Sequence, residues 1–226
     1  MTDEEILGRL GWFRAENRRR EGEVRVSGNR ALVTDGRIGF EAVLQEDRGK
    51  SGWDDFPESA LRGYIDQAAQ GAKWYSFTDE GVAALKKAVD DAKEERRKNA
   101  EYRRLDMTKC QCPCCGADLL WDGYHDELIE EDEYSEEKLE DVSTLLVPVE
   151  LTAGEECMLA NATYLFRAIY AFCDGNIGDV LFAICKKDNG RIAIRTRDGR
   201  VRGVLCCMRG DGEHLPAEIV LEPAEI

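Results

Sequence analysis

The sequence feature that most constrains the fold is an internal repeat. Residues 22–44 and 178–205 share an order of short apolar runs separated by Asn-Gly or Asp-Gly pairs, which supply the positive φ angles of tight hairpin turns. The expected turns are Asp35-Gly36, Asn189-Gly190 and Asp198-Gly199. Each segment therefore predicts three short antiparallel strands, and a repeat implies that both copies fold into the same unit.

A helical pattern precedes each set of strands. Apolar residues recur there every three or four positions, which is the spacing that forms one face of an α-helix. They are Ile6, Leu7, Leu10 and Phe13 in the first copy and Leu165, Ala168, Ile169 and Phe172 in the second. Asn161 is suited to cap the second helix. The segments after the strands also correspond, residues 56–61 in the first copy and 215–221 in the second.

A third, more diverged unit lies between these copies. Residues 73–77 predict a strand, and Thr78 predicts the cap of a helix whose apolar face includes Leu85 and Val89. Residues 102–107 and 117–121 then predict two further strands. The expected organisation is a partial domain with one unit at 1–72, and a domain with two units at 73–226 that carries a cysteine-rich and acidic insertion at 108–145.

The charge balance limits what the protein can bind. The chain has 226 residues, 43% of them hydrophobic, and its formal charge of −15 repels phosphate unless cations are gathered on one face. Residues 126–141 are strongly acidic and predict a surface excursion, either a loop or an exposed helix. The acidic start of the sequence and the absence of a long apolar run predict a cytoplasmic protein without a membrane span.

The second copy of the repeat resembles the half-domain from which DNA sliding clamps are built. The resemblance rests on residues 157–161, on the helical positions Tyr164, Leu165, Ala168 and Ile169, and on the closing strand 204–209. It implies an α+β fold of repeated strand-helix-three-strand units, with helices on one face and antiparallel sheets on the other. Sliding clamps form closed rings, so the resemblance also implies a homo-oligomer, because contacts between copies must close by rotation.

The function that this resemblance implies is that of a non-enzymatic processivity or scaffold factor in DNA replication. Such a protein encircles double-stranded DNA without reading its sequence and binds short apolar peptides of polymerase-like partners. Leu205 and Met208 match the position of the family's partner pocket, although Cys206 replaces the usual proline. Partner binding therefore depends on residues that follow the family pattern only in part.

Clustered cations supply the expected DNA contacts, because phosphates are bound through positive charge. The candidates are Lys86, Lys87, Lys93, Arg96, Arg97, Lys98, Arg103 and Arg104, together with Arg18, Arg19 and Arg20. A structural alternative is that residues 96–98 complement the carboxyl end of a helix and pair with the nearby carboxylates of Asp90, Asp91, Glu94 and Glu95. Both interpretations stay open at the level of sequence.

A cysteine cluster at 110–115 contains the C-P-x-C-G form of a zinc knuckle. Its second pair of ligands is missing, and the candidates for that pair are Cys110, Cys114, His125, Cys157 and the adjacent Cys206 and Cys207. Cys110 with His125 would complete one local zinc site with Cys112 and Cys115. The alternatives are a thiol-rich hairpin turn without metal, or a redox sensor. The remaining apolar segments contain Cys173, Cys185, Cys206 and Cys207, which we expect in the core, where free cysteine behaves as a small hydrophobe.

No catalytic arrangement is recognisable. The two histidines, His125 and His214, lie far apart in polar surroundings, and no phosphate-binding glycine loop is present, which predicts a protein that is not an enzyme. A second function, from a different class, is a zinc-knuckle interaction module of a phage or mobile element. Its acidic surface would bind a basic partner or imitate DNA.

Overall fold

The computed structural model describes residues 1–13, 24–51, 56–111, 118–122, 127–130, 146–186, 190–208 and 217–224, with the side chains of residues 99–130 left aside. The chain forms two compact units. Unit 1 comprises Met1–Lys86 and Pro148–Ile226, and unit 2 comprises Lys87–Val147. Unit 1 contains one large mixed sheet with helices and unit 2 a small three-stranded sheet, so the expected α+β class is confirmed.

The large sheet of unit 1 has the strand order β10-β9-β14-β5-β11-β12-β13-β3-β2-β1-β4. Its strands are β1 (Arg25–Ser27), β2 (Arg30–Thr34), β3 (Ile38–Val43), β4 (Lys50–Ser51), β5 (Tyr75–Ser76), β9 (Pro148–Ala153), β10 (Glu156–Asn161), β11 (Val180–Cys185), β12 (Arg191–Thr196), β13 (Val201–Cys206) and β14 (Ala217–Pro223). Neighbouring strands pair antiparallel except β14 and β9, which are parallel. The expectation of purely antiparallel sheets is therefore wrong at this pair.

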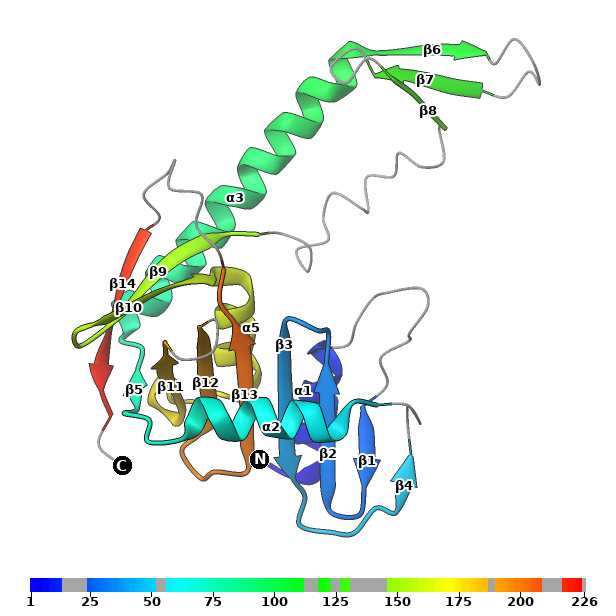
Figure 1. The fold of residues 1–226 in the computed structure, drawn as a ribbon. Coiled ribbons are helices and arrows are strands. Elements are labelled where there is room, and N and C mark those ends of the chain that lie inside the picture. The colour runs from blue at the N-terminus through cyan, green and yellow to red at the C-terminus, as the bar shows by residue number, and fades with distance from the viewer. Residues whose placement is uncertain are drawn as a thin grey trace. The chain divides into compact units, whose positions relative to one another are not determined.

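Two meanders form the centre of the sheet (Figure 1). Strands β1–β3 follow helix α1 (Asp3–Leu10) and the short 3-10 helix η1 (Gly11–Phe13), and strands β11–β13 follow α5 (Ala162–Phe172) and η3 (Ile177–Asp179). Gly36 and Gly199 have φ angles of 89° and 71°, as expected for the turns. Strand β3 pairs with β13, which joins the meanders edge to edge.

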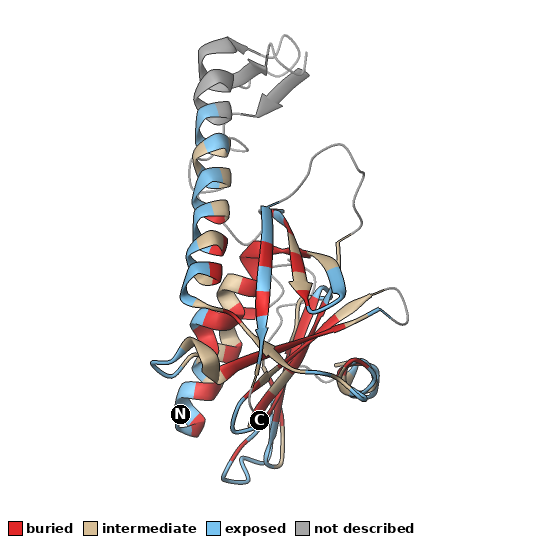
Figure 2. Ribbon diagram, turned by 90° about the vertical axis from the view of Figure 1, so that its left-hand side faces the viewer, coloured by how far each residue is buried: buried red, intermediate tan, exposed pale blue. Residues whose placement is uncertain are grey.

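Helices cover both faces of this sheet, as Figures 1 and 2 show. Helices α1 and α5 contact each other on one face, and α2 (Glu58–Ala69) lies across the opposite face over β3, β11, β12 and β13. The expectation that all helices share one face is therefore wrong for α2. The expected correspondence of residues 56–61 with 215–221 is also wrong, because the first segment leads into α2 and the second into strand β14.

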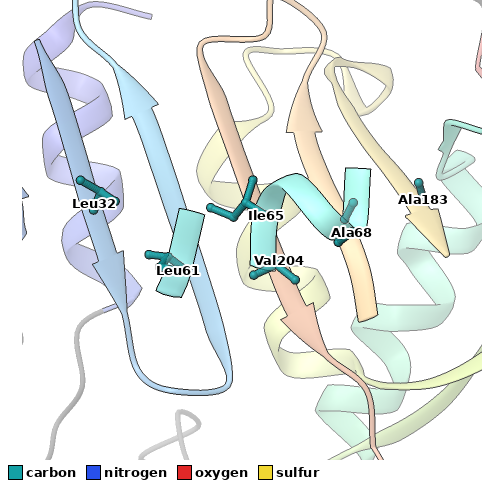
Figure 3. Close-up of a cluster of buried hydrophobic side chains, with 7 residues drawn as sticks. Leu32, Leu61, Ile65, Ala68, Ala183 and Val204 are labelled. Carbon is teal, nitrogen blue, oxygen red and sulfur yellow. The ribbon is translucent and has the colours of Figure 1, made fainter. Parts of the chain in front are cut away.

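Helix α2 forms because its apolar residues follow helical spacing and have a sheet to cover. Leu61, Ile65 and Ala68 lie on its inner side, and they pack against buried side chains of four strands (Figure 3). Those side chains are Leu32, Ala183, Ala193 and Val204. This cluster fills the layer between α2 and the two joined meanders.

An aromatic cluster fills the layer on the other face. Phe13 of η1, Phe40 of β3 and Phe172 of α5 are almost fully buried, and their ring centroids lie 4.6–5.8 Å apart. Gly203 is opposite Phe40 in the β3–β13 register, and a side chain at this position would collide with the Phe40 ring. The small residue at 203 therefore allows the aromatic cluster to span the junction between the meanders.

Helix α3 (Asp79–Asp106) begins in unit 1 and runs into unit 2. Its expected cap is confirmed, because the backbone amide of Gly81 donates to the Thr78 hydroxyl at 3.0 Å. The expected strand at 102–107 is wrong, since the helix continues to Asp106. No glycine or proline follows Gly81 before the helix ends, so nothing in the local sequence stops it.

Unit 2 continues with β6 (Met107–Gln111), β7 (Asp118–Asp122) and β8 (Glu127–Glu130), which pair in that order and antiparallel. The strand expected at 117–121 is confirmed by β7. Strand β8 lies within the acidic segment 126–141, where a loop or a helix was expected. The rest of that segment lies outside the described residues.

The remaining cysteines are not core residues. Cys206 is exposed, and Cys173, Cys185 and Cys207 are partly exposed. The expectation that they are buried is wrong because each lies at or just beyond the end of its helix or strand, where the neighbouring elements no longer cover it. Asn161, in contrast, caps α5 as expected, since its side-chain oxygen accepts from the Thr163 amide at 3.1 Å.

Candidate nucleic-acid and partner-binding surfaces

Most of the cations expected to bind DNA lie on α3. Lys87 pairs with Asp91 at 3.1 Å, and Glu94 lies within 3.7 Å of the cationic groups of both Arg97 and Lys98. Lys93 lies 4.0 Å from Asp90, and Lys86 and Arg96 also have interaction partners. The helical pairing that was one interpretation of this run is therefore present.

These ion pairs do not remove the cations from solvent. The side chains of Lys87, Arg97 and Lys98 are 79%, 77% and 62% exposed, and exposed pairs of this kind contribute only about 0.3–0.5 kcal/mol each. A polyanion can therefore compete for them at little cost. Arg103 and Arg104 belong to the last turns of α3, but their side chains are not among those described, and residues 18–20 lie outside the described residues.

The two residues of the expected partner pocket differ in accessibility. Leu205 is fully buried in β13, where it pairs with Ile192 and Ile38, whereas Met208 is partly exposed just after that strand. The amide of Met208 donates to the Leu159 carbonyl of β10 at 3.0 Å. Of the two, only Met208 can contact a bound peptide without rearrangement of the core.

One of the four candidate zinc ligands lies on a described strand. Cys110 is on β6, opposite Leu119 of β7, and residues 112–117 connect the two strands. Cys112, Cys115 and His125 lie outside the described residues. Among the side chains that are described, no group of three or more histidine, cysteine, aspartate or glutamate residues is arranged to hold a metal ion.

A buried carboxylate that the sequence pattern did not predict lies on the α2 face. Glu41 of β3 is fully buried and accepts hydrogen bonds from Arg30 (2.7 Å), Arg62 (2.9 Å) and Arg202 (2.5 and 3.0 Å). Burial raises the pKa of this carboxyl, but the hydrogen bonds and positive charge of the arginines outweigh burial and hold the pKa below its ordinary value. Arg202 also pairs with Asp66 of α2 at 2.9 Å.

Two further arginines of β12 lie against aromatic rings on this α2 face. The guanidinium of Arg191 lies 4.3 Å from the ring centroid of Tyr64, and that of Arg195 lies 4.3 Å from the ring centroid of Trp74. Burial, followed by the positive charge of Arg197, lowers the pKa of Arg195. The sequence signal for these contacts is weak, because alternate arginines in a strand indicate only that they share one face.

The opposite, α1/α5 face carries an exposed row of aromatic rings. Tyr170 of α5 stacks with Trp12 of η1 (centroids 6.1 Å apart, 23° between planes) and with Phe166 one turn earlier (6.2 Å, 16°). Tyr170 is 70% exposed and Trp12 is 45% exposed. The sequence offered one signal, an aromatic pair at i and i+4 on a helix whose core face is already occupied by other apolar residues.

Two arginines border this aromatic row. Arg9 donates to the Ala171 carbonyl at 2.8 Å, and Arg167 donates to the Trp12 carbonyl while its guanidinium lies 5.6 Å from the Phe13 ring centroid. No carboxylate of the described residues lies within 4.0 Å of either guanidinium. The hydrogen bond from the Thr2 amide lowers the pKa of the Glu5 carboxyl, and the charge of Arg9 adds a smaller contribution in the same direction.

A hollow of about 350 Å³ opens beside the end of α5. Its lining combines acidic and basic groups, and the N-terminal amine lies 3.3 Å from the carboxylate of Asp174. The lining residues are Met1, Phe172, Asp174, Asp179, Thr196, Arg197 and Asp198. The carboxylate of Asp198 stabilises the β12–β13 turn, because it accepts hydrogen bonds from the Thr196 hydroxyl and the Arg200 amide.

The helices within the described part of the chain include none long and apolar enough to cross a membrane. Comparison with known protein families, with curated proteins and with solved structures finds no match for this chain.

Proposed function

We propose that this protein is a non-enzymatic, sliding-clamp-like scaffold that associates with double-stranded DNA without reading its sequence. The observation that carries the proposal is the junction of the two helix-and-meander segments. Strands β3 and β13 pair antiparallel, and the helices that precede the two meanders, α1 and α5, contact each other on one face of the resulting sheet. The resemblance to a clamp domain implies helices on one face of antiparallel strands, and this junction supports the proposal in that respect, whereas α2 lies on the opposite face and departs from that pattern.

The junction is a rigid platform in physical terms. Five residue pairs join β3 to β13, and Phe13, Phe40 and Phe172 fill the layer between this part of the sheet and the helices. Aromatic residues bury large areas, and a close-packed layer of this kind resists relative movement of the elements that it joins. The helices can therefore present their outer side chains to a ligand in a fixed arrangement.

The charge of the helix face supports DNA as that ligand. Arg9 and Arg167 lie there without a carboxylate of the described residues within 4.0 Å, although the whole chain carries a charge of −15. By itself, α3 also carries exposed cations, and phosphate can displace their weak ion pairs. Backbone contact through scattered cations gives binding that is independent of sequence and sensitive to salt.

The proposal includes a homo-oligomer and a site for partner peptides, as the resemblance implies. A ring requires copies of the chain to close around DNA, so the protein should have one defined oligomeric mass. Peptide binding would involve Met208, because Leu205 is buried within the sheet. A variant Met208→Ala should weaken binding of such peptides and leave the oligomeric mass unchanged.

Encirclement can be tested by DNA topology. Protein incubated with a nicked circular plasmid should remain bound during gel filtration at moderate salt, and linearising the plasmid should release it, because a ring slides off free ends. Equal retention on circular and linear plasmid would contradict encirclement. A purely monomeric mass at high protein concentration would contradict it as well.

The contribution of α3 can be measured with matched variants. The triple change Arg96→Gln, Arg97→Gln and Lys98→Gln should reduce the slope of log K against log salt by up to about 2.7, if each cation contacts one phosphate of duplex DNA. A control removes the same charge from exposed lysines outside this helix, Lys50, Lys73 and Lys186. Equal slopes for the two triple variants would restrict residues 96–98 to a role in the helix itself.

A second candidate function is that of a zinc-containing acidic interaction module. The observation that favours it is the pairing of β6 with β7, because residues 112–117 then connect two adjacent antiparallel strands, the setting in which a knuckle turn holds two thiolates. Elemental analysis of protein prepared without chelator should find one zinc per chain. A stoichiometry far below one would reject a zinc site with Cys110, Cys112, Cys115 and His125 as ligands.

A further inference from the structure

We propose that the aromatic row on the α1/α5 face, formed by Trp12, Tyr170 and Phe166, binds single-stranded nucleic acid by stacking with unpaired bases. This activity goes beyond association with duplex DNA and does not require a ring. It rests on three properties of this surface: the exposure of the rings, their parallel arrangement, and the cations beside them.

The first property is exposure, because these rings are not part of the hydrophobic core. Tyr170 is 70% exposed and Trp12 is 45% exposed, whereas Phe13 of η1 and Phe172 of α5 are almost fully buried. A folded chain gains little from holding a large aromatic side chain in water. The surface therefore offers apolar area that a ligand can cover without any rearrangement of the protein.

The arrangement of the rings suits bases in particular. The plane of Tyr170 is within 23° of the plane of Trp12 and within 16° of that of Phe166. Unpaired bases can stack on near-parallel rings that are held in a fixed arrangement, because every base has a flat aromatic face. Such binding tolerates any base, as expected for a surface that makes few directional hydrogen bonds.

The neighbouring charges favour a nucleic acid over an apolar peptide. Arg9 and Arg167 border the row, each uses its guanidinium to donate to a backbone carbonyl, and no carboxylate of the described residues lies within 4.0 Å of either. Each guanidinium has five N–H donors, so donors remain for a phosphate after the bond to a carbonyl and, for Arg9, a contact with Met1 Sδ at 3.2 Å. Aromatic rings interleaved with cations are the combination that binds single strands.

The test uses a short fluorescein-labelled oligothymidine, with anisotropy as the readout at low salt. Tyr170→Ala and Trp12→Ala should each weaken binding about 5-fold to 150-fold, the loss expected when one base loses an aromatic partner. Trp12→Phe keeps a ring and should retain most of the affinity. Arg167→Gln should lower the slope of log K against log salt by about 0.7, the value for one phosphate of a single strand.

The matched control is Tyr64→Ala, because Tyr64 is 47% exposed and belongs to α2, which covers the opposite face of the sheet. It should leave oligothymidine binding unchanged. The inference is overturned if wild-type protein does not bind the oligothymidine, if Tyr170→Ala binds it as well as wild type, or if Tyr170→Ala only abolishes self-association or peptide binding. If the protein binds oligothymidine but is not retained on the circular plasmid, only encirclement is overturned. The two proposals can therefore be tested separately.

Discussion

Replacing Glu41 with glutamine should destabilise the protein by about 3 kcal/mol. Removing one member of a buried ion pair generally costs about 3–5 kcal/mol of folding stability, because the remaining charge is left without an opposite charge. The lower end applies here, since the side chains of Arg30, Arg62 and Arg202 are 44%, 30% and 37% exposed and water can partly replace the lost carboxylate. Glutamine keeps the size of the side chain, so the loss measures charge and hydrogen bonding rather than a cavity.

Urea unfolding followed by tryptophan fluorescence and far-ultraviolet circular dichroism provides the assay. A loss of about 3 kcal/mol lowers the melting temperature by about 6–12 °C for a chain of this size. The midpoint should fall without a change in the denaturant slope, because Glu41→Gln should not alter the surface exposed on unfolding. The matched control is Asp66→Asn, which removes an exposed carboxylate from the same Arg202 and should cost at most about 1 kcal/mol.

The dependence of this loss on pH supplies an independent test. The pKa of Glu41 in the folded protein is held below its ordinary value of 4.5, so its contribution to stability is fully present above that pH. It is lost as the pH falls through the folded-state pKa. The difference between wild type and Glu41→Gln should therefore be constant from pH 7 to about 5 and shrink below 4.5. The reasoning would be refuted if Glu41→Gln lost no more stability than Asp66→Asn, or if its loss of stability were the same at pH 3 as at pH 7.

Three further changes test other parts of the fold. Ile65→Ala should cost about 2–5 kcal/mol in urea unfolding, because it opens a cavity between α2 and the sheet, and a smaller loss would mean that the layer collapses to fill it. Gly203→Ala should cost about 1–3 kcal/mol, since its methyl group meets the Phe40 ring, and unchanged stability would show that the ring can move aside. Replacing Cys112 and Cys115 with serine should abolish bound zinc in elemental analysis, and retained metal would place the site elsewhere.

Local signals in the sequence predicted local structure well. Thr78 and Asn161 cap helices α3 and α5, and Gly36 and Gly199 adopt the positive φ angles that their turns require. Each of these features depends on interactions between residues only two or three positions apart in the chain. The pattern of the chain could therefore predict them without knowledge of the sheet.

Features that depend on distant partners were not predictable. Residues 56–61 and 215–221 look alike as short apolar segments after a proline or near one, yet the first leads into α2 and the second pairs with β9 as a strand. An apolar run of this length does not distinguish a helix from a strand, and the surface available for packing decides. The strand expected at 102–107 is wrong for a related reason, because the uninterrupted helix formers before Tyr102 carry α3 through this apolar segment to Asp106.

The Glu41 cluster was also not predictable from the sequence, because it depends on residues far apart in the chain. Its arginines come from β2, α2 and β13, at separations of 11, 21 and 161 residues from Glu41, and only the pairing of β3 with β13 brings Arg202 beside it. Burial of a glutamate in the apolar segment 38–43 requires compensating charge. The sequence could not identify which of the many cations supplies it.

Two arginines on the α1/α5 face are held differently from those on the α2 face, and this difference bears on how an acidic chain can bind an anion. On the α2 face, Arg30, Arg62 and Arg202 are held by Glu41 and, for Arg202, also by Asp66. On the α1/α5 face, Arg9 and Arg167 donate to backbone carbonyls instead. A carbonyl fixes the position of a guanidinium but does not neutralise its charge. The net charge of −15 therefore does not describe the local potential at the helix face, which decides whether phosphate can bind there.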